Sequence, residues 1–433
     1  MKNRASSRTR RGNNAIQQGR RADIIRILHT GDWHVGQTLR GFPRDYEHRK
    51  VFERLTAIVT EREIDALIVA GDVFDSQNPS GEAQQLFYDT LVSLSRARPR
   101  MTIVIVAGNH DSAGRLEAPR PLLEAFNIHV VGNIRRRDGK IDAARHLVPL
   151  YDATGATAAH VLAVSYPTAA CLPNLVRLED EAGSPVVRAV RALYGELIET
   201  LRPRFDGLPL IMTGHLHVAG AIESEGAERR ILVGGQHAVP PDVFPAEASY
   251  VALGHLHRAQ AVGRETIRYS GSLIPLSATE QPYAHGVTLV SFDGAHVASE
   301  HIPIARPVPF LRLPDASDMR LSELGDRLAA LQLPVNLPVF ERPFVQVRLA
   351  REGLMPGFRE EVDRIAESFP IRIVDVRVTS LISTTVEVAT AAALIRLAER
   401  DPEDLFKLAF EREFGAAPDA AHLDVFHRAR AEA

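Results

Sequence analysis

The sequence predicts a layered α/β domain with its sheet buried between helices, followed by a small α+β unit and C-terminal helices. From residue 23 onward, short apolar segments alternate with longer segments of helical periodicity. A Pro-rich stretch at 303–314 then separates a second group of elements and is interpreted as a linker. The length of 433 residues agrees with this division, since it is typical of about two or three domains.

Strands and helices of the first part follow in a regular order. The run 66–70 is continuously apolar, which is typical of a strand covered on both faces. In the helical segment before it, Phe52, Leu55 and Val59 share one face. The elements expected here are strands at 24–29, 66–70 and 102–107, with helices at 45–62 and 81–97. Further strands are expected at 161–165, 209–213, 250–253, 266–269, 287–291 and 296–302, with a helix at 186–201.

The C-terminal part contains a compact unit and two helices. In the last segment Asp401 is the expected N-cap, Pro402 stands at the first helical position, and Gly415 is the expected stop. The other elements expected here are strands at 344–349 and 371–378, a helix at 357–368, and a short final helix at 419–431. The expected division of the chain is a disordered basic tail (1–22), a large domain (23–304), a small domain (305–385) and C-terminal helices (386–433).

Composition limits the class of protein. The 45% apolar and 24% charged content is that of an ordinary globular protein, and no apolar run approaches the roughly 18 residues that span a membrane. A single cysteine, Cys171, excludes an internal disulfide and favours a reducing, cytoplasmic location. The net charge of −3 gives no sign of nucleic-acid binding. The basic tail 1–22 is either a solvated extension or an electrostatic arm for DNA phosphates.

Possible metal ligands follow five strands of the large domain, each after a glycine. Because ligands collect beyond the carboxyl ends of strands in an open α/β sheet, these loops are expected to meet at one edge. Any one of the motifs is weak, since Asp at a strand end is usually a turn residue, but five in order are hard to obtain by chance. The loops carry Asp32 and His34, Asp72 and Asp75, Asn109 to Asp111, His215 and His217, and His255 and His257.

The mixture of ligand types indicates two cations rather than one. Carboxylate, amide oxygen and imidazole suit manganese, iron or zinc, and the lack of thiolates excludes a structural zinc cage. Seven plausible ligands exceed what one ion takes from a protein, whereas two ions about 3.5–4 Å apart that share a carboxylate use them all. Such a pair activates water and binds the oxygens of a phosphoester, so phosphoester hydrolysis is the expected reaction class.

The strings GDWH, GDVFD and GNHD and the two GHLH segments resemble the calcineurin-like metallophosphoesterases. The longer strings GDWHVGQTL, GDVFDSQNPS, GNHDSAGRLEA, TGHLHVAG, ALGHLHRAQ and RYSGSLIPLS resemble the SbcD branch, the nuclease subunits of bacterial SbcCD complexes. The resemblance covers about 24–302 and continues more loosely into the small domain. It implies a layered metallophosphoesterase β-sandwich flanked by helices, with 305–385 as a DNA-capping domain.

Position by position, the resemblance also implies roles for single residues. The first metal would be bound by Asp32, His34, Asp72 and His257, and the second by Asp72, Asn109, His215 and His255. His110 matches the catalytic histidine, whereas Asp75 and Asp111 are expected to hold loops and orient histidines. His217 is expected to bind neither metal. Trp33 either packs in its loop or stacks on DNA.

The function implied by the resemblance is that of a DNA nuclease working with a partner. Such proteins act as manganese-dependent double-strand exonucleases and single-strand or hairpin endonucleases, in DNA end processing, repair and recombination. They form dimers that join SbcC, an ABC-type ATPase with coiled coils, and this chain lacks a GxxxxGK[ST] loop of its own. The C-terminal helices, with Leu405, Phe406, Phe410 and Phe426, either bind this partner or pack on their own small domain.

Two other functions are compatible with the metal-binding pattern. A phosphodiesterase or phosphatase for a smaller substrate would share the five loops but would need neither a capping domain nor C-terminal helices. A scaffold protein without activity would be expected to lack some of the ligands, and every expected ligand position is filled.

Overall fold

The computed structural model describes residues 24–379 and 401–432, except 153, 173–183, 206, 224–237, 295, 352–353, 356 and 415–416. The chain divides into two compact units between residues 379 and 380. The predicted basic tail 1–22, the predicted boundary at 385 and the expected stop at Gly415 lie outside the described residues. Within these ranges no helix has both the length and the apolar character needed to cross a membrane.

Six strands form the first sheet of the large domain, in the order β16-β15-β1-β4-β5-β6. The strands β1, β4, β5 and β6 run parallel, while β15 and β16 are antiparallel additions at the β1 edge. The helices α2 (Asp45–Glu61) and α3 (Gly81–Ala97) pack on one face. The bounds are β1 Ile24–Thr30, β4 Ala66–Ala70, β5 Thr102–Val106, β6 Ile128–Val131, β15 Gly286–Asp293 and β16 His296–Pro303.

A second sheet of six strands has the order β13-β14-β12-β11-β10-β9. Its strands β10, β11, β12 and β14 are parallel, and β9 and β13 are antiparallel edges. The helix α6 (Pro185–Leu201) covers one face. The bounds are β9 Leu147–Tyr151, β10 Thr157–Leu162, β11 Leu210–His215, β12 Ala248–Gly254, β13 Gln260–Val262 and β14 Arg264–Tyr269.

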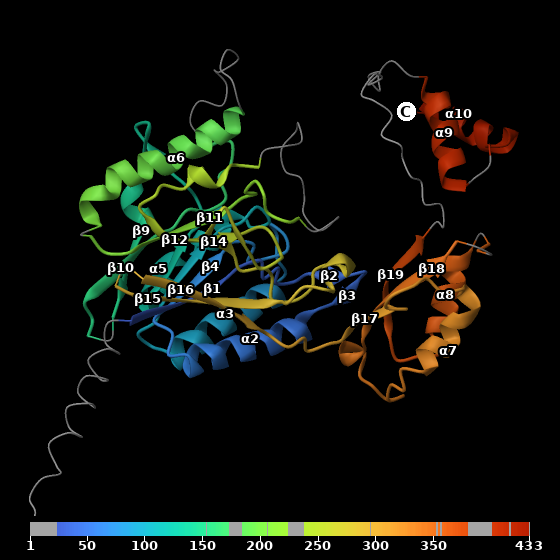
Figure 1. The fold of residues 1–433 in the computed structure, drawn as a ribbon, viewed down its shortest axis with the longest axis horizontal. Helices are drawn as coiled ribbons and strands as arrows, with labels where there is room; N and C mark the ends of the chain where they lie inside the picture. The colour runs from blue at the N-terminus through green and yellow to red at the C-terminus, as the bar shows by residue number, and fades with distance from the viewer. Residues whose placement is uncertain are drawn as a thin grey trace, which may run out of the picture. The chain divides into compact units, whose positions relative to one another are not determined.

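The two sheets pack against each other, so the large domain is a β-sandwich with helices on both outer sides (Figure 1). Ile27 and Ile68 of the first sheet share a core with Ile211 and Tyr250 of the second. Periodicity predicted a single sheet covered by helices on both faces, and this expectation is wrong. Each sheet is covered by helices on its outer face only, because its inner face packs against the second sheet. The sandwich implied by the resemblance is confirmed.

The small domain contains a parallel sheet of three strands, β17 (Phe310–Leu313), β18 (Phe344–Ala350) and β19 (Arg372–Thr379). Helices α7 (Leu324–Ala329) and α8 (Phe358–Ala366) contribute Leu324, Leu328 and Val362 to its core. The interpretation of 303–314 as a linker is wrong in its second half, because β17 lies within it. The prolines there are tolerated since β17 is an edge strand.

The second unit contains the helices α9 (Pro402–Phe414) and α10 (Ala420–Glu432). Asp401 Oδ1 accepts the Glu403 amide at 2.9 Å, which confirms the predicted cap. The rings of Phe406 and Phe426 stack with centroids 4.6 Å apart, so the two helices pack on each other.

Short elements complete the fold. Among them, the 3₁₀ helix η5 (Ala278–Glu280) lies beside His257 of the second GHLH segment. The other short strands and helices are β2 Thr38–Leu39, β3 Phe42–Pro43, β7 Arg136–Arg137, β8 Lys140–Ile141, α4 Ala113–Glu117, α5 Arg120–Leu123, η1 Glu124–Phe126, η2 Ala143–His146, η3 Arg202–Arg204, η4 Pro241–Val243, η6 Leu321–Glu323 and η7 Val339–Glu341.

Candidate metal centre

The five strand-end loops meet at one edge of the sandwich. Three loops follow the neighbouring parallel strands β1, β4 and β5, and two follow β11 and β12 of the opposite sheet. Asp32 and His255 join the two sheets, since Asp32 Oδ1 accepts the His255 amide at 2.8 Å. The predicted site residues that come together there are Asp32, His34, Asp72, Asn109, His110, His215, His255 and His257.

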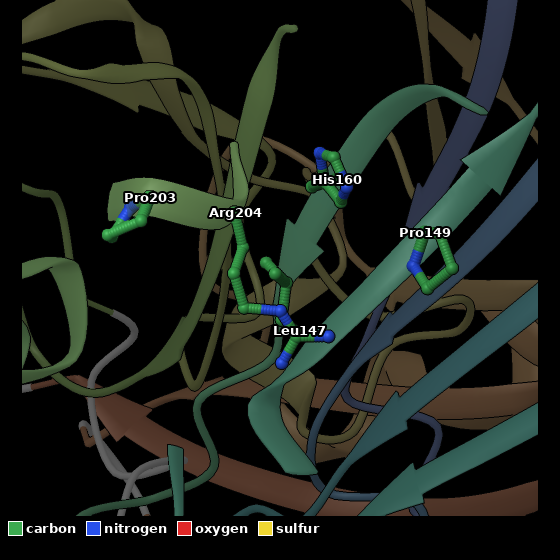
Figure 2. A pocket seen from close by; sticks show the side chains of 5 residues that line it. All are labelled: Leu147, Pro149, His160, Pro203 and Arg204. Carbon is green, nitrogen blue, oxygen red and sulfur yellow. The ribbon is translucent and has the colours of Figure 1, made fainter. Parts of the chain in front are cut away.

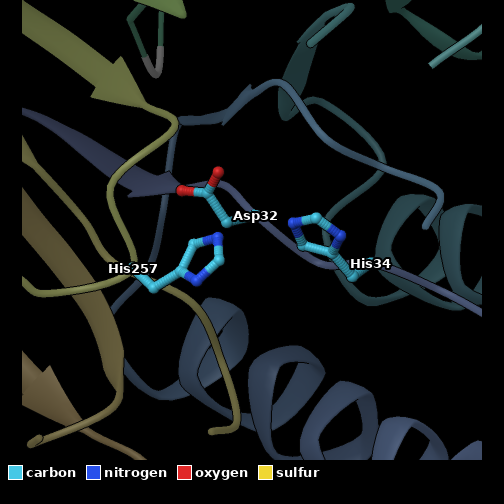
Figure 3. A group of neighbouring side chains, drawn as sticks. All are labelled: Asp32, His34 and His257. Atoms are coloured by element: carbon cyan, nitrogen blue, oxygen red, sulfur yellow. The ribbon is translucent and has the colours of Figure 1, made fainter. Parts of the chain in front are cut away.

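One group of ligands consists of Asp32, His34 and His257, whose side chains point toward one another (Figure 3). All three are buried, and one potential ligand atom of each lies within 4.8 Å of the others. A carboxylate oxygen and two imidazole nitrogens at such separations can bind a divalent ion of the first transition series.

A second group consists of Asp72, His215 and His255, with the Asn109 amide oxygen between the two histidines. Asn109 Oδ1 lies 3.0 Å from His215 Nε2 and 3.1 Å from His255 Nδ1. Amide oxygen, carboxylate and imidazole again form a borderline-hard ligand set.

Asp72 lies between the two groups. Its Oδ2 atom is 3.6 Å from His34 Nε2 and 3.2 Å from His215 Nε2, so the same carboxylate oxygen faces a histidine of each group. The Oδ1 atom accepts the amide of His110 at 2.8 Å. A carboxylate in this position can serve two ions at once.

His110 lies beside both groups and is partly exposed. Its ring centroid is 4.8 Å from that of His34, and its Nδ1 atom donates to the carbonyl oxygen of Asp75 at 2.9 Å. Because Nδ1 is engaged by the backbone, Nε2 is the atom available to a substrate. His110 also forms a group with His34 and Asp72 whose potential ligand atoms lie within 4.8 Å of one another.

Three histidines of the centre have their Nδ1 atoms held by acceptors. His34 Nδ1 lies 3.1 Å from Asp75 Oδ1, and His215 Nδ1 lies 2.8 Å from the Ala70 carbonyl oxygen. His257 Nδ1 lies 2.9 Å from Glu280 Oε1. In each case the acceptor fixes the tautomer that leaves Nε2 with its lone pair, as metal-binding imidazoles require.

Glu280 is the partner that sequence reasoning missed. It is fully buried and belongs to the short helix η5, in a segment with no motif of its own. The only signal available was a carboxylate downstream of the second GHLH segment, and nothing local indicates that it folds back onto His257.

Asp111 holds two of the loops together through backbone hydrogen bonds. Its carboxylate accepts the amides of Val73, Phe74 and Gly108 at 3.1, 2.9 and 2.8 Å. Burial, together with the nearby Asp72 charge, raises the pKa of Asp111 to about 6. The carboxylate thus fixes the loops after β4 and β5 relative to each other.

Strained backbone also occurs in these loops. Asp32, His34, Asp72 and His255 have positive φ angles of 51°, 46°, 49° and 100°. Such conformations cost of order 1–3 kcal/mol each in non-glycine residues and persist where the surroundings enforce them. Gly108 is required by space, since a Cβ atom there would collide with the Asp72 carboxylate.

Burial and neighbouring charges both shift the pKa values of the centre. Burial would lower the pKa of His215, but the Asp72 carboxylate outweighs it and raises that pKa to about 9. Burial raises the pKa of Asp32, and for Asp72 its neighbour His215 outweighs burial and lowers the pKa. Burial, reinforced by His215, lowers the pKa of His255 to about 3. Buried carboxylates of this kind need positive charge close to them.

Two buried atoms test directly whether the centre fits metal ions. Asp32 Oδ2 and His34 Nε2 have no hydrogen-bond partner among the residues that the structure describes. A buried acceptor without a partner costs about 1–3 kcal/mol, which a bound cation would recover. Both atoms belong to one ligand group, so the residues fit a divalent metal.

Two residues of the predicted loops lie apart from the ligand groups. His217 Nε2 lies 3.1 Å from Glu223 Oε1 and is partly exposed. Trp33 is fully buried against Phe52 and Phe87, and its Nε1 atom donates to Thr30 Oγ1 at 2.9 Å. Trp33 therefore packs in its loop, and the alternative of stacking on DNA is wrong.

A pocket of about 340 Å³ lies elsewhere in the large domain (Figure 2). It is lined by residues of β9, β10 and η3, and it contains none of the predicted site residues. Its lining consists of Leu147, Pro149, His160, Pro203 and Arg204.

Comparison with known proteins agrees with this geometry. The calcineurin-like phosphoesterase family matches residues 25–219, which contain the first four ligand loops. The type 5 capsule protein repressor C-terminal domain matches residues 306–414. The first of these families implies divalent metal ions at the centre.

Curated relatives cover most of the chain. The SbcD chain of the SbcCD nuclease from Rhodobacter capsulatus is 46% identical over 388 residues, which are 89% of this chain and 94% of that protein. The SbcD chain from Bacillus subtilis is 40% identical over 276 residues (61% and 66%), and that from Escherichia coli K12 is 29% identical over 366 residues (82% and 85%). The chain belongs to the SbcD family of nucleases, within the calcineurin-like metallophosphoesterases.

Proposed function

We propose that this chain is a dinuclear-metal DNA nuclease, acting as a double-strand exonuclease and as a single-strand and hairpin endonuclease in DNA end processing. The observation that supports it best is the position of Asp72, whose single carboxylate oxygen faces His34 of one ligand group and His215 of the other. One shared carboxylate between two ligand sets is the arrangement that two-metal phosphoester hydrolysis requires.

The proposed ligands follow the two groups. The first metal site consists of Asp32, His34, Asp72 and His257, and the second consists of Asp72, Asn109, His215 and His255. Manganese is the proposed ion, because the resemblance to the SbcD branch implies it and a mixed oxygen and imidazole set without thiolate can bind it.

Bound metal ions would supply an acidified water and positive charge for the phosphate oxygens. The role of the chain is to hold the ligands rigidly and to donate one proton to the leaving oxygen. His110 has Nδ1 fixed on the Asp75 carbonyl oxygen and a partly exposed ring, so Nε2 can donate to the leaving oxygen or stabilise its charge.

We further propose that an SbcC-like ABC ATPase is the partner and that two copies of this chain form a homodimer within a heterotetramer. The relatives are named as parts of a complex, and this sequence has no phosphate-binding GxxxxGK[ST] loop. On α9 and α10, Leu408 and Val425 are 52% and 60% exposed, so each helix offers an apolar side chain to a helix of the partner. The single cysteine and the DNA substrate favour a cytoplasmic location.

The decisive experiment measures cleavage of linear and hairpin DNA with manganese, with and without the ATPase. Manganese-dependent degradation from ends and opening of hairpins are expected, with the ATP dependence supplied by the partner. Turnover of a small aryl phosphodiester without DNA cleavage under any condition would contradict the proposal and favour a phosphodiesterase for smaller substrates.

A further inference from the structure

The short helix η5 links the metal centre to its surroundings through Glu280. Glu280 Oε1 lies 2.9 Å from His257 Nδ1, and Oε2 accepts the Leu276 amide at 2.8 Å. An ionised carboxylate only accepts hydrogen bonds, so His257 Nδ1 carries the hydrogen and Nε2 keeps its lone pair. Glu280 therefore determines both the tautomer and the orientation of His257.

The other side of η5 faces the small domain. Ala278, at the start of η5, packs against the cluster that contains Phe310 of β17 and Phe344 of β18. The next residue after η5, Gln281, donates through Nε2 to the Phe310 carbonyl oxygen at 3.4 Å. One turn of three residues thus contacts a proposed metal ligand on one side and the small-domain sheet on the other.

The loop that leads into η5 is held by Arg44. Arg44 Nη1 donates to the Pro275 carbonyl oxygen and, at 2.9 Å, to Gln37 Oε1. Gln37 in turn donates through Nε2 to the Leu276 carbonyl oxygen at 2.9 Å. Two consecutive carbonyls before η5 are therefore fixed by one hydrogen-bonded pair of side chains.

Arg44 is held by Glu47 of α2 and is covered by the small domain. Its guanidinium is fully buried, donates to both oxygens of Glu47 at 2.7 and 2.8 Å, and lies 5.3 Å from the centre of the Phe344 ring. Arg372 of β19 lies 3.7 Å from the centre of the same ring. The small domain therefore covers Arg44 with an aromatic face that attracts cations.

We infer that Glu280 is a positioning residue for His257, and that the seating of the small domain on Arg44 and η5 sets the metal affinity of the first site. The inference rests on the proposed function only in taking His257 as a ligand. Because such coupling is reciprocal, metal binding at the first site also stabilises the docking of the small domain.

Calorimetric titration of manganese into the metal-free full-length chain tests the role of Glu280. In Glu280→Ala we expect one ion to bind roughly 10–100-fold more weakly, the usual cost of losing the partner of a metal-binding histidine, while the other is unchanged. Glu280→Gln keeps an acceptor oxygen for only one of the His257 and Leu276 hydrogen bonds, and its metal affinity is expected to lie between those of Glu280→Ala and the parent. Parent affinities for both ions in Glu280→Ala would overturn the inference.

Two controls separate positioning from general damage. Glu300→Gln changes an exposed glutamate on β16 and should leave both affinities unchanged. Nitrogen-15 spectra of the histidines report the tautomer, and the His257 signal of the metal-free chain should change in Glu280→Ala. A merely structural role would leave that tautomer as in the parent.

A double-mutant cycle tests the connection through the loop. Gln37 is partly exposed, so Gln37→Ala should fold, and it is expected to weaken the same ion as Glu280→Ala does. In the Glu280→Ala background, Gln37→Ala should not weaken the affinity for this ion further, because both residues act through the loop that leads into η5. If Gln37→Ala weakens the affinity as much in that background as it does in the parent, the proposed connection through the loop is wrong.

Phe344→Leu tests the contribution of the small domain, since it keeps an apolar side chain but removes the ring. The first ion should again bind more weakly, and an unchanged affinity would overturn the coupling to the small domain. None of these measurements depends on nuclease activity. A chain that shows the coupling but cuts no DNA would therefore contradict the proposed function and leave this inference standing.

Discussion

At the scale of single residues, the metal centre is made of side chains that come from five loops and are oriented by a few acceptors. Asp75, the Ala70 carbonyl and Glu280 each hold the Nδ1 atom of one histidine. The sequence supports the prediction of the ligands because glycine, carboxylate and imidazole recur at strand ends. It cannot indicate Glu280, because that contact depends on how η5 is placed in the fold.

Asp72→Asn keeps the shape of the side chain but removes its charge. We expect loss of metal binding at both sites. The rate of cleavage should fall by more than the roughly 100-fold that results when a metal ligand loses the residue that hydrogen-bonds to it. The asparagine oxygen can still accept the His110 amide, so the loop should stay in place. Metal content and nuclease rates of the purified variant check this, and two bound ions in Asp72→Asn would contradict the shared position of Asp72.

His110→Ser separates catalysis from metal binding. We expect both metals to remain and turnover to fall by about 10²–10⁴-fold, the usual contribution of a general acid. The measurement is metal stoichiometry beside kcat on the same preparation, and His217→Ser is the matched control that should change neither. If His110→Ser empties a site, His110 is a ligand and its proposed role is wrong.

At the scale of elements, the strands and helices with strong periodicity are predicted closely, and the irregular ones are not. The strand 66–70 and the helix 81–97 have the observed bounds, since each has a continuous apolar run or an apolar face. The strand β17 was hidden by the prolines around it, and β6 and β9 were not expected. The pairing of strands into two sheets depends on contacts far apart in the chain, which no local pattern reveals.

The helices α9 and α10 allow a prediction for the proposed partner surface. Replacing Leu408 and Val425 by aspartate places charge on the exposed apolar surface, so co-purification with the ATPase should be lost while basal phosphodiesterase activity stays unchanged. Glu265→Gln, which changes an exposed glutamate on β14 of the large domain, is the control. Deleting 401–433 should have the same effect, and retained co-purification would contradict the proposal.

At the scale of the whole molecule, stability depends on histidines that are buried without charge. His29 lies between the sheets, donates from Nε2 to the Leu253 carbonyl and accepts from the Tyr250 hydroxyl at Nδ1. Burial lowers the pKa of His29 to about 3 and that of His285 to about 4, below the ordinary value of 6.5. Below pH 6.5 the unfolded chain therefore binds more protons than the folded one.

The free energy of unfolding should consequently fall as the pH falls below about 6.5 and continue to fall toward pH 4. Between pH 7 and pH 5 each of these two histidines contributes a loss of about 2 kcal/mol. Urea unfolding at pH 7 and at pH 5, in the presence of a chelator, measures this change in the free energy of unfolding. His29→Gln, which can make both hydrogen bonds, should lose less stability on acidification than the parent, whereas the exposed His296→Gln should match the parent. An equal loss in parent and His29→Gln would contradict this assignment.

The bond from the His255 amide to Asp32 joins positions 223 residues apart in the chain. Protein synthesis proceeds from the N-terminus, so the β1, β4 and β5 loops leave the ribosome long before the last three of the proposed histidine ligands. A nascent chain that ends before His257 can fold part of the first sheet but cannot complete both ligand groups. If the proposed ligands hold the metal ions, we expect the nuclease to be inactive until this part of the chain has been made, so that nearby nucleic acid is not cut during translation.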